Sequence, residues 1–174
     1  MFSLTEFKES FSDGFAESSK FRLELTAPSK LNLPGNIARN LTFLCEVAEL
    51  PGRSVATGER RVYGPTQKVP YNTIYNDLNV TFMCDGKLNI RKTFDDWLDL
   101  IVNKNTHDIN YLDDYACTID IIQLDRFGKN VRRYSMRDAF PINIEGQAVS
   151  WSDTDSILKL NVVFTYKTWQ AFEF

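Results

Sequence analysis

The side chains best suited to chemistry are five aspartates in the middle of the chain: Asp95, Asp96, Asp99, Asp113 and Asp114. Carboxylate pairs can bind Mg²⁺ or act as general acids and bases. Asp95 and Asp99, however, fall on the side of an expected helix that lies opposite its apolar stripe, where charges are normally solvated. Asp113 and Asp114 precede an expected strand, where aspartate is a common turn residue. We therefore expect no metal site at these residues.

The chain has few side chains suited to nucleophilic or histidine-based catalysis. There is one histidine, His107, in a polar stretch, and a triad or a histidine metal site would need unusual partners. The three cysteines, Cys45, Cys84 and Cys117, lie inside apolar runs, so we expect reduced thiols that serve as small hydrophobic side chains. No GxxxxGK[ST] phosphate loop occurs. The sequence predicts no catalytic, cofactor-binding or metal-binding residue, and no enzyme.

Composition sets the class of protein. The chain has 174 residues, enough for one domain over residues 1–174, with 13% aromatic residues and a net charge of −3. Nucleic-acid-binding modules normally carry a basic excess, so this class is disfavoured. No stretch approaches the ~20 apolar residues of a membrane span, and no secretory signal is expected. We expect a protein made in a cytosol, with no membrane insertion.

One substantial helix is expected, at about residues 87–103. Its apolar residues recur at helical spacing and predict one buried stripe: Ile90, Phe94, Trp97, Leu98 and Ile101. A short amphipathic helix is also expected near the N-terminus, from Leu4, Phe7 and Phe11. The sequence thus offers one long helix to pack against a sheet.

The rest of the chain is mainly β in character. Alternating or continuous apolar residues predict strands at Phe21–Ala27, Leu41–Leu50, Leu78–Cys84, Tyr115–Gln123, Val131–Met136, Pro141–Ile144 and Ile157–Trp169. Ser29–Asn40 is expected to be a loop, and Gly128 to supply a positive φ in a hairpin turn. This order lacks the alternation of a parallel sheet. We expect two packed antiparallel sheets, as a sandwich or a partly open barrel, with one flanking helix.

The segment from about 53 to 75 is unusual, because it holds many β-forming residues but no clean hydrophobic face. We expect it to form a projecting hairpin arm, since long segments without a buried face are uncommon in compact domains. The residues expected to contact another subunit or another ring are Val55, Arg60, Arg61, Val62, Tyr63, Val69 and Tyr71. Such an arm predicts a chain that assembles with copies of itself.

Several segments together resemble the tail tube proteins of contractile-tailed bacteriophages. They are Phe43–Gly52, a strand that runs into a Leu-Pro-Gly corner; the arm after it; Leu78–Asp85; the helix segment Phe94–Asp99; and the closing segment Leu160–Tyr166 followed by Trp169. The resemblance covers most of residues 2–169, and the order and spacing of the segments carry it.

The resemblance implies a structural virion protein whose subunits form hexameric rings that stack into a tube. DNA and the tape-measure protein would pass through the tube, and the tail sheath and baseplate would be further partners. It implies a location in the virion tail, after assembly in the host cytoplasm. Closure of the sheets between subunits would also remove exposed strand edges, which otherwise pair without control.

Two alternatives stay open. One is a baseplate tube-initiator ring protein of the same fold, or a related secretion-system tube protein. The other is a small β-barrel domain, either a metal-dependent enzyme or a binding module, that uses the aspartates.

Overall fold

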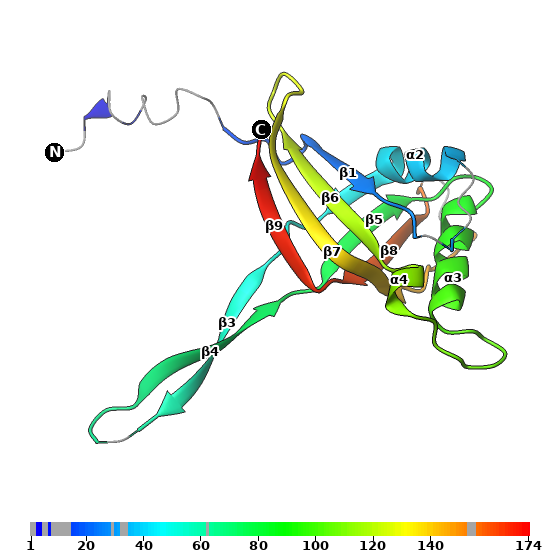
Figure 1. Cartoon of the computed structure of the whole chain (residues 1–174). Coiled ribbons are helices and arrows are strands. Elements are labelled where there is room, and N and C mark those ends of the chain that lie inside the picture. Colours follow the sequence, from blue (N-terminus) through cyan, green and yellow to red (C-terminus); the bar gives the residue numbers. More distant parts are fainter. Residues whose placement is uncertain are drawn as a thin grey trace.

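The structure, a computed structural model, is mainly β and describes residues 3, 4, 7, 15–28, 30–31, 35–61, 63–152 and 156–174 (Figure 1). Its elements are β1 (Phe21–Leu25), α2 (Gly35–Leu44), β2 (Cys45–Ala48), β3 (Arg53–Arg60), β4 (Gln67–Tyr75), β5 (Leu78–Met83), α3 (Asn89–Ile101), α4 (Leu112–Tyr115), β6 (Cys117–Leu124), β7 (Asn130–Ile144), β8 (Lys159–Thr165) and β9 (Thr168–Glu173). Leu4 and Phe7 are helical, whereas Phe11, the third residue of the expected N-terminal helix, lies outside the described residues.

All described strand pairs are antiparallel, and apart from the separate β3–β4 hairpin they form two layers that share strand β7. We call β1, β6, β9 and the first part of β7 sheet I. Sheet II comprises β2, β5, β8 and the last part of β7. Strands β1 and β2 stand at the two ends of the described strand order, so the described sheets form no closed barrel. The predicted pair of antiparallel sheets in a partly open arrangement is confirmed.

Strand β7 changes sheets at Asp138. Up to Arg137 it pairs with β9, and from Phe140 onward it pairs with β8. Asp138 has a φ of 54°, the left-handed region that most residues avoid. A bend of this kind is a usual way for a strand to pass from one sheet to another. The expected separate strand at Pro141–Ile144 is wrong, because it is the end of the 15-residue strand β7.

The core lies between the two sheets and helix α3. The largest buried side chains include Trp97 and Phe94 from α3 with Phe82 and Phe164 from sheet II. The Phe82 and Phe94 ring centroids are 5.2 Å apart, and Phe164 meets Phe94 edge-on at 5.9 Å. Each fully buried ring of this size contributes roughly 1.5–3 kcal/mol. These contacts fix α3 against the interior side of sheet II.

A second helix, α2, replaces part of the expected loop and strand. The expectation of a loop through Asn40 and a strand from Leu41 is wrong. Ile37, Leu41 and Leu44 follow helical spacing, and Leu41 is fully buried while the other two pack partly against the core. Phe43 points outward and stacks with the Arg39 guanidinium at 5.7 Å. The alternating residues from Leu41 to Val47 had suggested a strand, whose true start is Cys45.

The expected closing strand is interrupted. Tyr166 and Lys167 separate β8 from β9, so a single strand over Ile157–Trp169 is wrong. The predicted inward alternation of Leu160, Val162, Phe164 and Tyr166 is confirmed, because all four are buried. The chain then returns along the other edge of β7, where Trp169 lies opposite Met136. The other hairpin behaves as expected: β6 and β7 are antiparallel neighbours, and Gly128 has a φ of +80°.

Candidate functional site

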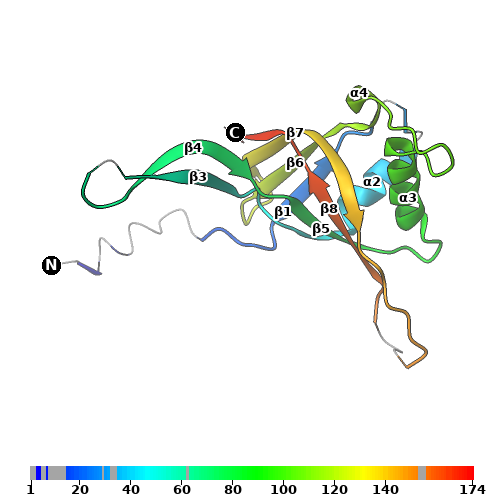
Figure 2. The same cartoon turned by 90° about the horizontal axis from the view of Figure 1, so that it is seen from below.

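The most distinctive feature is the hairpin of β3 and β4, which projects away from the rest of the molecule (Figures 1 and 2). We call residues 53–75 the arm. Its two strands pair only with each other, from Arg53 opposite Tyr75 to Arg60 opposite Gln67. At about 3.3 Å per residue, an eight-residue strand extends roughly 26 Å. The predicted projecting hairpin is therefore confirmed as a two-stranded sheet of its own.

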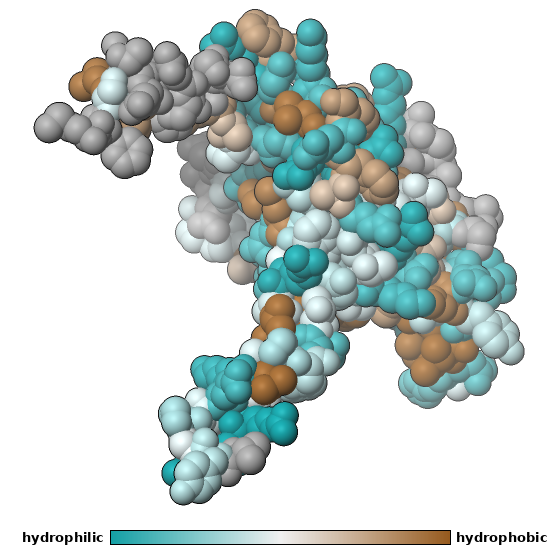
Figure 3. All heavy atoms as spheres, turned by 60° about the vertical axis from the view of Figure 1, so that its left-hand side comes forward, coloured by the Kyte–Doolittle hydropathy of each residue, from teal (hydrophilic) through white to brown (hydrophobic). Residues whose placement is uncertain are grey.

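The arm keeps large side chains in contact with solvent. Tyr63 near its tip is fully exposed, Tyr71 is 73% exposed and Val55 is 57% exposed. Arg60, Arg61 and Val69 are also exposed, whereas Val62 lies outside the described residues. Figure 3 shows brown apolar spheres scattered along the arm among polar ones. An isolated two-stranded hairpin is at best marginally stable in water, so such an arm gains from cover by a partner.

Apolar side chains occupy both faces of the arm. Val55 lies opposite Thr73, and the next pair along is Ser54 with Ile74. Successive residues of a strand point to opposite faces, so Val55 and Ile74 lie on different sides of the ribbon. Ile74 is 48% exposed and was not among the residues expected to make contacts. The strand pairing would have identified it: because Val55 lies opposite Thr73, the next residue, Ile74, points to the other face of the arm.

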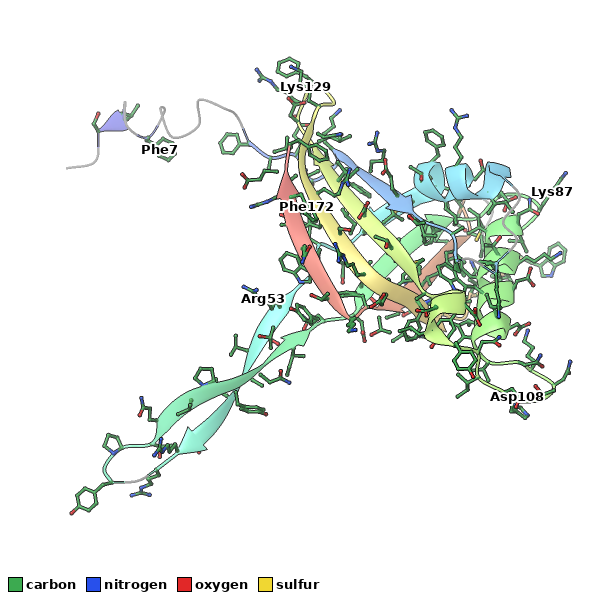
Figure 4. All side chains as sticks on the ribbon, viewed as in Figure 1. Phe7, Arg53, Lys87, Asp108, Lys129 and Phe172 are labelled. Carbon is green, nitrogen blue, oxygen red and sulfur yellow. The ribbon has the colours of Figure 1, made fainter. Side chains whose placement is uncertain are left out.

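The charge of the arm is opposite to that of the rest of the chain. The arm carries four basic side chains and one acidic one, whereas the whole chain has a net charge of −3, which leaves −6 for the remainder. Arg60, Arg61 and Lys68 form no ion pair with the described part of the chain. Arg53, at the base of the arm, also points outward (Figure 4). A basic arm on an acidic body favours contact between copies.

Four strand edges of the body are free within the described residues, and one of them is the last part of β7, which pairs only with β8. Strand β1 pairs only with β6, β2 only with β5, and β9 only with β7. Phe172 stands on β9 with a 45% exposed side chain (Figure 4). Unpaired edges are templates for pairing with another chain. The arm and these edges therefore form the candidate assembly surface.

The aspartates occupy separate places. Asp95 forms an ion pair with Arg91 at 3.7 Å, and Asp99 accepts a hydrogen bond from Lys104 at 2.7 Å. This bond raises the pKa of Lys104. Asp96 is exposed on α3, and Asp113 and Asp114 belong to the short helix α4 rather than to the turn that the sequence suggested. Across the described residues, no group of three His, Cys, Asp or Glu side chains is placed to hold a metal ion.

The histidine and two of the cysteines lie in different surroundings. His107 is exposed in the loop after α3, with a φ of 60°. Cys117 is buried and Cys45 is partly buried; burial raises the pKa of the Cys45 thiol to about 12 and that of Cys117 further still. Such thiols stay protonated and are poor nucleophiles. Among the helices that the structure describes, none is long and apolar enough to span a membrane.

The α3 residues expected to pack do so to different degrees. Ile90, Phe94 and Trp97 are buried, whereas Leu98 and Ile101 are half-buried. Thr93, which the stripe omitted, is also buried, and its hydroxyl donates to the Asn89 carbonyl oxygen at 2.9 Å. A threonine that bonds the preceding turn can be buried with its hydroxyl paired, and the predicted stripe omitted Thr93 because it counted only apolar residues.

Comparisons with known structures agree on this fold. The chain is similar to a protein in the anti-feeding prophage baseplate, with a TM-score of 0.67, 13% identity and coverage of 91% of this chain and 96% of the other. It is also similar to a chain in an extracellular contractile injection system, in a sheath–tube complex in the extended state, with a TM-score of 0.65, 12% identity and full coverage of both chains. A chain in the anti-feeding prophage cap that terminates the tube gives a TM-score of 0.64 at 12% identity, covering 91% of each chain.

Sequence comparison is more specific. No curated protein matches the chain. The family model described as phage tail tube protein, however, matches residues 16–172, which include both sheets, the arm and the helices. The chain therefore belongs to the phage tail tube protein family.

Proposed function

We propose that this protein is the repeating subunit of a contractile tail tube. Six copies would close into a ring, and the rings would stack into the conduit through which DNA passes. The observation that carries this proposal is the arm, which holds exposed apolar side chains on both faces and whose strands pair only with each other within the described residues. A ribbon of this kind gains stability only when other copies cover it.

The similar structures support the same assembly. One belongs to a baseplate with six-fold symmetry imposed, one to a sheath–tube complex and one to a tube-terminating cap. By analogy, the outer partners of this tube would be a tail sheath and a baseplate, and its contents would be DNA and a tape-measure protein. The whole chain would act as a single domain of a virion tail assembled in the host cytoplasm.

The protein would act without catalysis. Three of the candidate aspartates, Asp95, Asp99 and Asp114, form ion pairs, and burial keeps the Cys45 and Cys117 thiols protonated. A tube wall needs rigid contacts and an inert surface rather than an active site. Calorimetric titration with Mg²⁺ tests this, because binding that disappears in Asp95→Ala and Asp99→Ala would point to a metal-dependent domain instead.

A baseplate tube-initiator ring is the second candidate function. The observation that favours it is the likeness to a protein of the anti-feeding prophage baseplate. An initiator would form single rings and require another protein to extend them. A tube subunit would add rings of its own kind.

Electron microscopy of the purified chain at high concentration tests the proposal. Stacked tubes are expected; single rings that never stack would favour the initiator, and a strictly monomeric protein would overturn both. Sedimentation velocity gives the same distinction in solution. The free chain should show a distribution of sizes that grows with concentration.

The arm can be tested by shortening it. Replacing Thr57–Tyr71 with Asn-Gly keeps the Ala56–Asn72 pair and closes the hairpin with a two-residue turn, because Asn72 has the backbone N–H that Pro70 lacks. Circular dichroism should report an intact fold, while stacking should be lost. Phe127→Ala provides a matched control, because it removes an exposed ring from the tip of the β6–β7 hairpin and should leave stacking unchanged. Normal tubes from the shortened arm would contradict its assigned role.

A further inference from the structure

We propose that the loop between β7 and β8 binds the tip of another copy's arm. This inference rests on the proposed function, because it names the surface on which the arm docks when rings stack. We call residues 145–158 the β7–β8 loop, of which 145–152 and 156–158 are described. The contact brings Tyr63 of one copy against Val149, Trp151 and Ile157 of the next.

The arm and the β7–β8 loop lie at opposite ends of sheet II. The arm leads into β5 at Leu78, which lies opposite Phe164 near the end of β8. The β7–β8 loop leads into the start of β8 at Lys159, which lies opposite Met83 at the far end of β5. Figure 2 shows the two projections leaving the body on different sides, with the loop in orange. The arm of one chain therefore extends away from the loop of the same chain.

The β7–β8 loop carries large apolar side chains that the described chain leaves uncovered. Trp151 is fully exposed, Val149 is 83% exposed and Ile157 is 62% exposed. Tryptophan is highly buried on average in folded proteins, and groups of exposed apolar residues mark interaction sites. Tryptophan is also among the residues that most often dominate the binding energy of protein interfaces. The loop therefore has the composition of a docking surface.

The base of the loop is fixed to the body by hydrogen bonds. Gln147 Oε1 accepts a bond of 2.7 Å from Arg91 Nη1 on α3, and Gln147 Nε2 donates to the Lys159 carbonyl oxygen at 2.8 Å. The Cys84 backbone N–H donates to the Leu158 carbonyl oxygen at 2.9 Å. A binding surface that is already held in place loses less entropy when its partner arrives.

A hollow lies between the two limbs of the loop. Its volume is about 470 Å³, and Val149 and Ile157 are among the residues that line it. Beside it, the Ser150 and Ser152 hydroxyl oxygens lie 2.6 Å apart, and the Ser152 backbone N–H donates to Ser150 Oγ at 3.2 Å. These bonds close a small turn around Trp151. The hollow has room for one aromatic ring next to the Trp151 indole, and aromatic pairs are favourable at such contacts.

The tip of the arm offers an aromatic ring for this hollow. Tyr63 is fully exposed, and Gly64 after it has a φ of 88° in the turn that closes the arm. A tyrosine provides a large contact area at a low cost in conformational entropy, because it has only two side-chain torsions to fix. The arm thus presents a suitable anchor at the point farthest from its own body.

The charges of the two segments are opposite. The arm has four basic side chains and one acidic one, whereas residues 145–158 include three acidic residues and no basic one. Opposite charges across an interface speed association and fix its orientation, while like charges exclude wrong pairings. Two arms would repel each other, and so would two loops. The charges therefore favour contact between an arm and a loop over either symmetric contact.

A second exposed apolar patch lies at the other end of the body. Ile109 and Tyr111, in the connection between α3 and α4, are 73% and 85% exposed. This patch is at the arm's end of the molecule, because Tyr115 of α4 packs on Phe140, which lies opposite Thr165 at the end of β8. A stack that keeps growing needs contact between different surfaces of successive copies. The β7–β8 loop, at the opposite end, meets this requirement better.

Photochemical cross-linking from the arm tip tests the contact. Tyr63 is replaced by benzoylphenylalanine, which keeps an aromatic ring and attaches to C–H groups near it. The variant is assembled with an excess of isotope-labelled parent chain, and peptide mass spectrometry identifies the labelled peptides attached to the probe. The same probe in place of Phe127 is the matched control, because that ring is also exposed at the tip of a hairpin.

In tubes, the probe at Tyr63 should attach to labelled peptides from residues 145–158, whereas the probe at Phe127 should not. Unassembled subunits should give neither product. Attachment mainly to another segment, such as the α3–α4 connection, or to no other copy, would overturn the inference while the tubes still support the proposed function. If the parent chain forms no tubes, the proposed function fails first.

Trp151→Ala gives an independent measurement of the same contact. The concentration at which tubes form should rise about tenfold or more, because interface tryptophans commonly contribute at least this much to binding. Urea unfolding should match that of the parent chain, since the ring is fully exposed. Phe127→Ala should change neither quantity. Tubes of Trp151→Ala at the parent's concentration would refute docking on this loop.

Discussion

The indole Nε1 of Trp97 on α3 donates a hydrogen bond of 2.9 Å to the backbone carbonyl oxygen of Tyr115. Tyr115 ends α4, and β6 begins two residues later. The Trp97 ring itself is fully buried and stacks with Phe94 at 6.1 Å. A single side chain thus anchors the flanking helix to the start of a central strand.

Trp97→Phe should lower the free energy of unfolding by about 2–4 kcal/mol. The substitution leaves a buried carbonyl without its donor, which costs about 1–3 kcal/mol, and it adds a small cavity. Trp151→Phe is the control, because that ring is fully exposed and its replacement should change stability by less than about 0.5 kcal/mol. Urea unfolding measures both. Equal changes in the two variants would mean that the Trp97 hydrogen bond and buried ring do not stabilise the fold more than an exposed tryptophan does.

The two faces of α2 should respond differently to alanine. Leu41→Ala should cost about 2–5 kcal/mol, because its side chain is fully buried. Phe43→Ala should cost only about 0.5–1 kcal/mol, since it removes an exposed ring and its stacking with Arg39. If this segment were a strand with both residues inward, the two costs would be similar. Thermal unfolding of the two variants distinguishes a helix from a strand in this segment.

Backbone strain at Asp138 predicts an unusual order of substitutions. Asp138→Gly should be neutral or stabilising, because glycine adopts a φ of 54° freely. Asp138→Val should cost about 1–3 kcal/mol, because a branched side chain is strained in this region. The long ion pair to Lys167, at 3.9 Å and largely exposed, should matter little. Lys167→Ala checks that contribution separately, and a glycine variant as unstable as the valine one would refute the strain argument.

Alkaline pH should destabilise the fold through its buried thiols. Cys45 has a pKa of about 12 in the folded chain against an ordinary value of 9.0, and burial raises the pKa of Cys117 as well. The thiol contribution is fully present below pH 9 and is lost as pH rises toward 12, because the unfolded chain releases its protons first. The slope is at most ~1.4 kcal/mol per pH unit for each thiol.

Cys45→Ala isolates this effect from other alkaline titrations. Urea unfolding at pH 8, 9, 10 and 11 should show a shallower decline in the variant than in the parent chain. Cys84→Ala serves as a second cysteine control. Identical slopes in the parent and in Cys45→Ala would rule out a contribution from that thiol.

Much of the fold follows from local patterns in the sequence. The apolar stripe on α3 and the alternation in β5 and β8 can be recognised in the sequence because one side of each element is buried and the other faces solvent. The arm could be predicted because its sequence has no such pattern: its apolar residues, among them Val55 and Tyr71, do not form one buried face. Patterns of this kind depend on burial within a single chain.

The elements that were predicted wrongly lie where the sequence fits two kinds of structure or gives no local signal. Leu41 and Leu44 fit a helix together with Ile37, but Leu41 also begins an alternating run that ends in a real strand. The chain reverses at Tyr166 and Lys167 without a glycine or proline, so the local sequence contains no turn signal there. The join between the two sheets at Asp138 depends on which strands flank β7. That is decided by tertiary pairing rather than by sequence spacing.

The sharing of β7 between the two sheets has a mechanical consequence. Because the chain is covalently continuous through Asp138, sheet I and sheet II cannot slide past each other unless ladder hydrogen bonds break on one side of the bend. A force applied to one layer is thus carried directly into the other along a single backbone. In the proposed tube, the wall would move as one body, without internal slip between its layers.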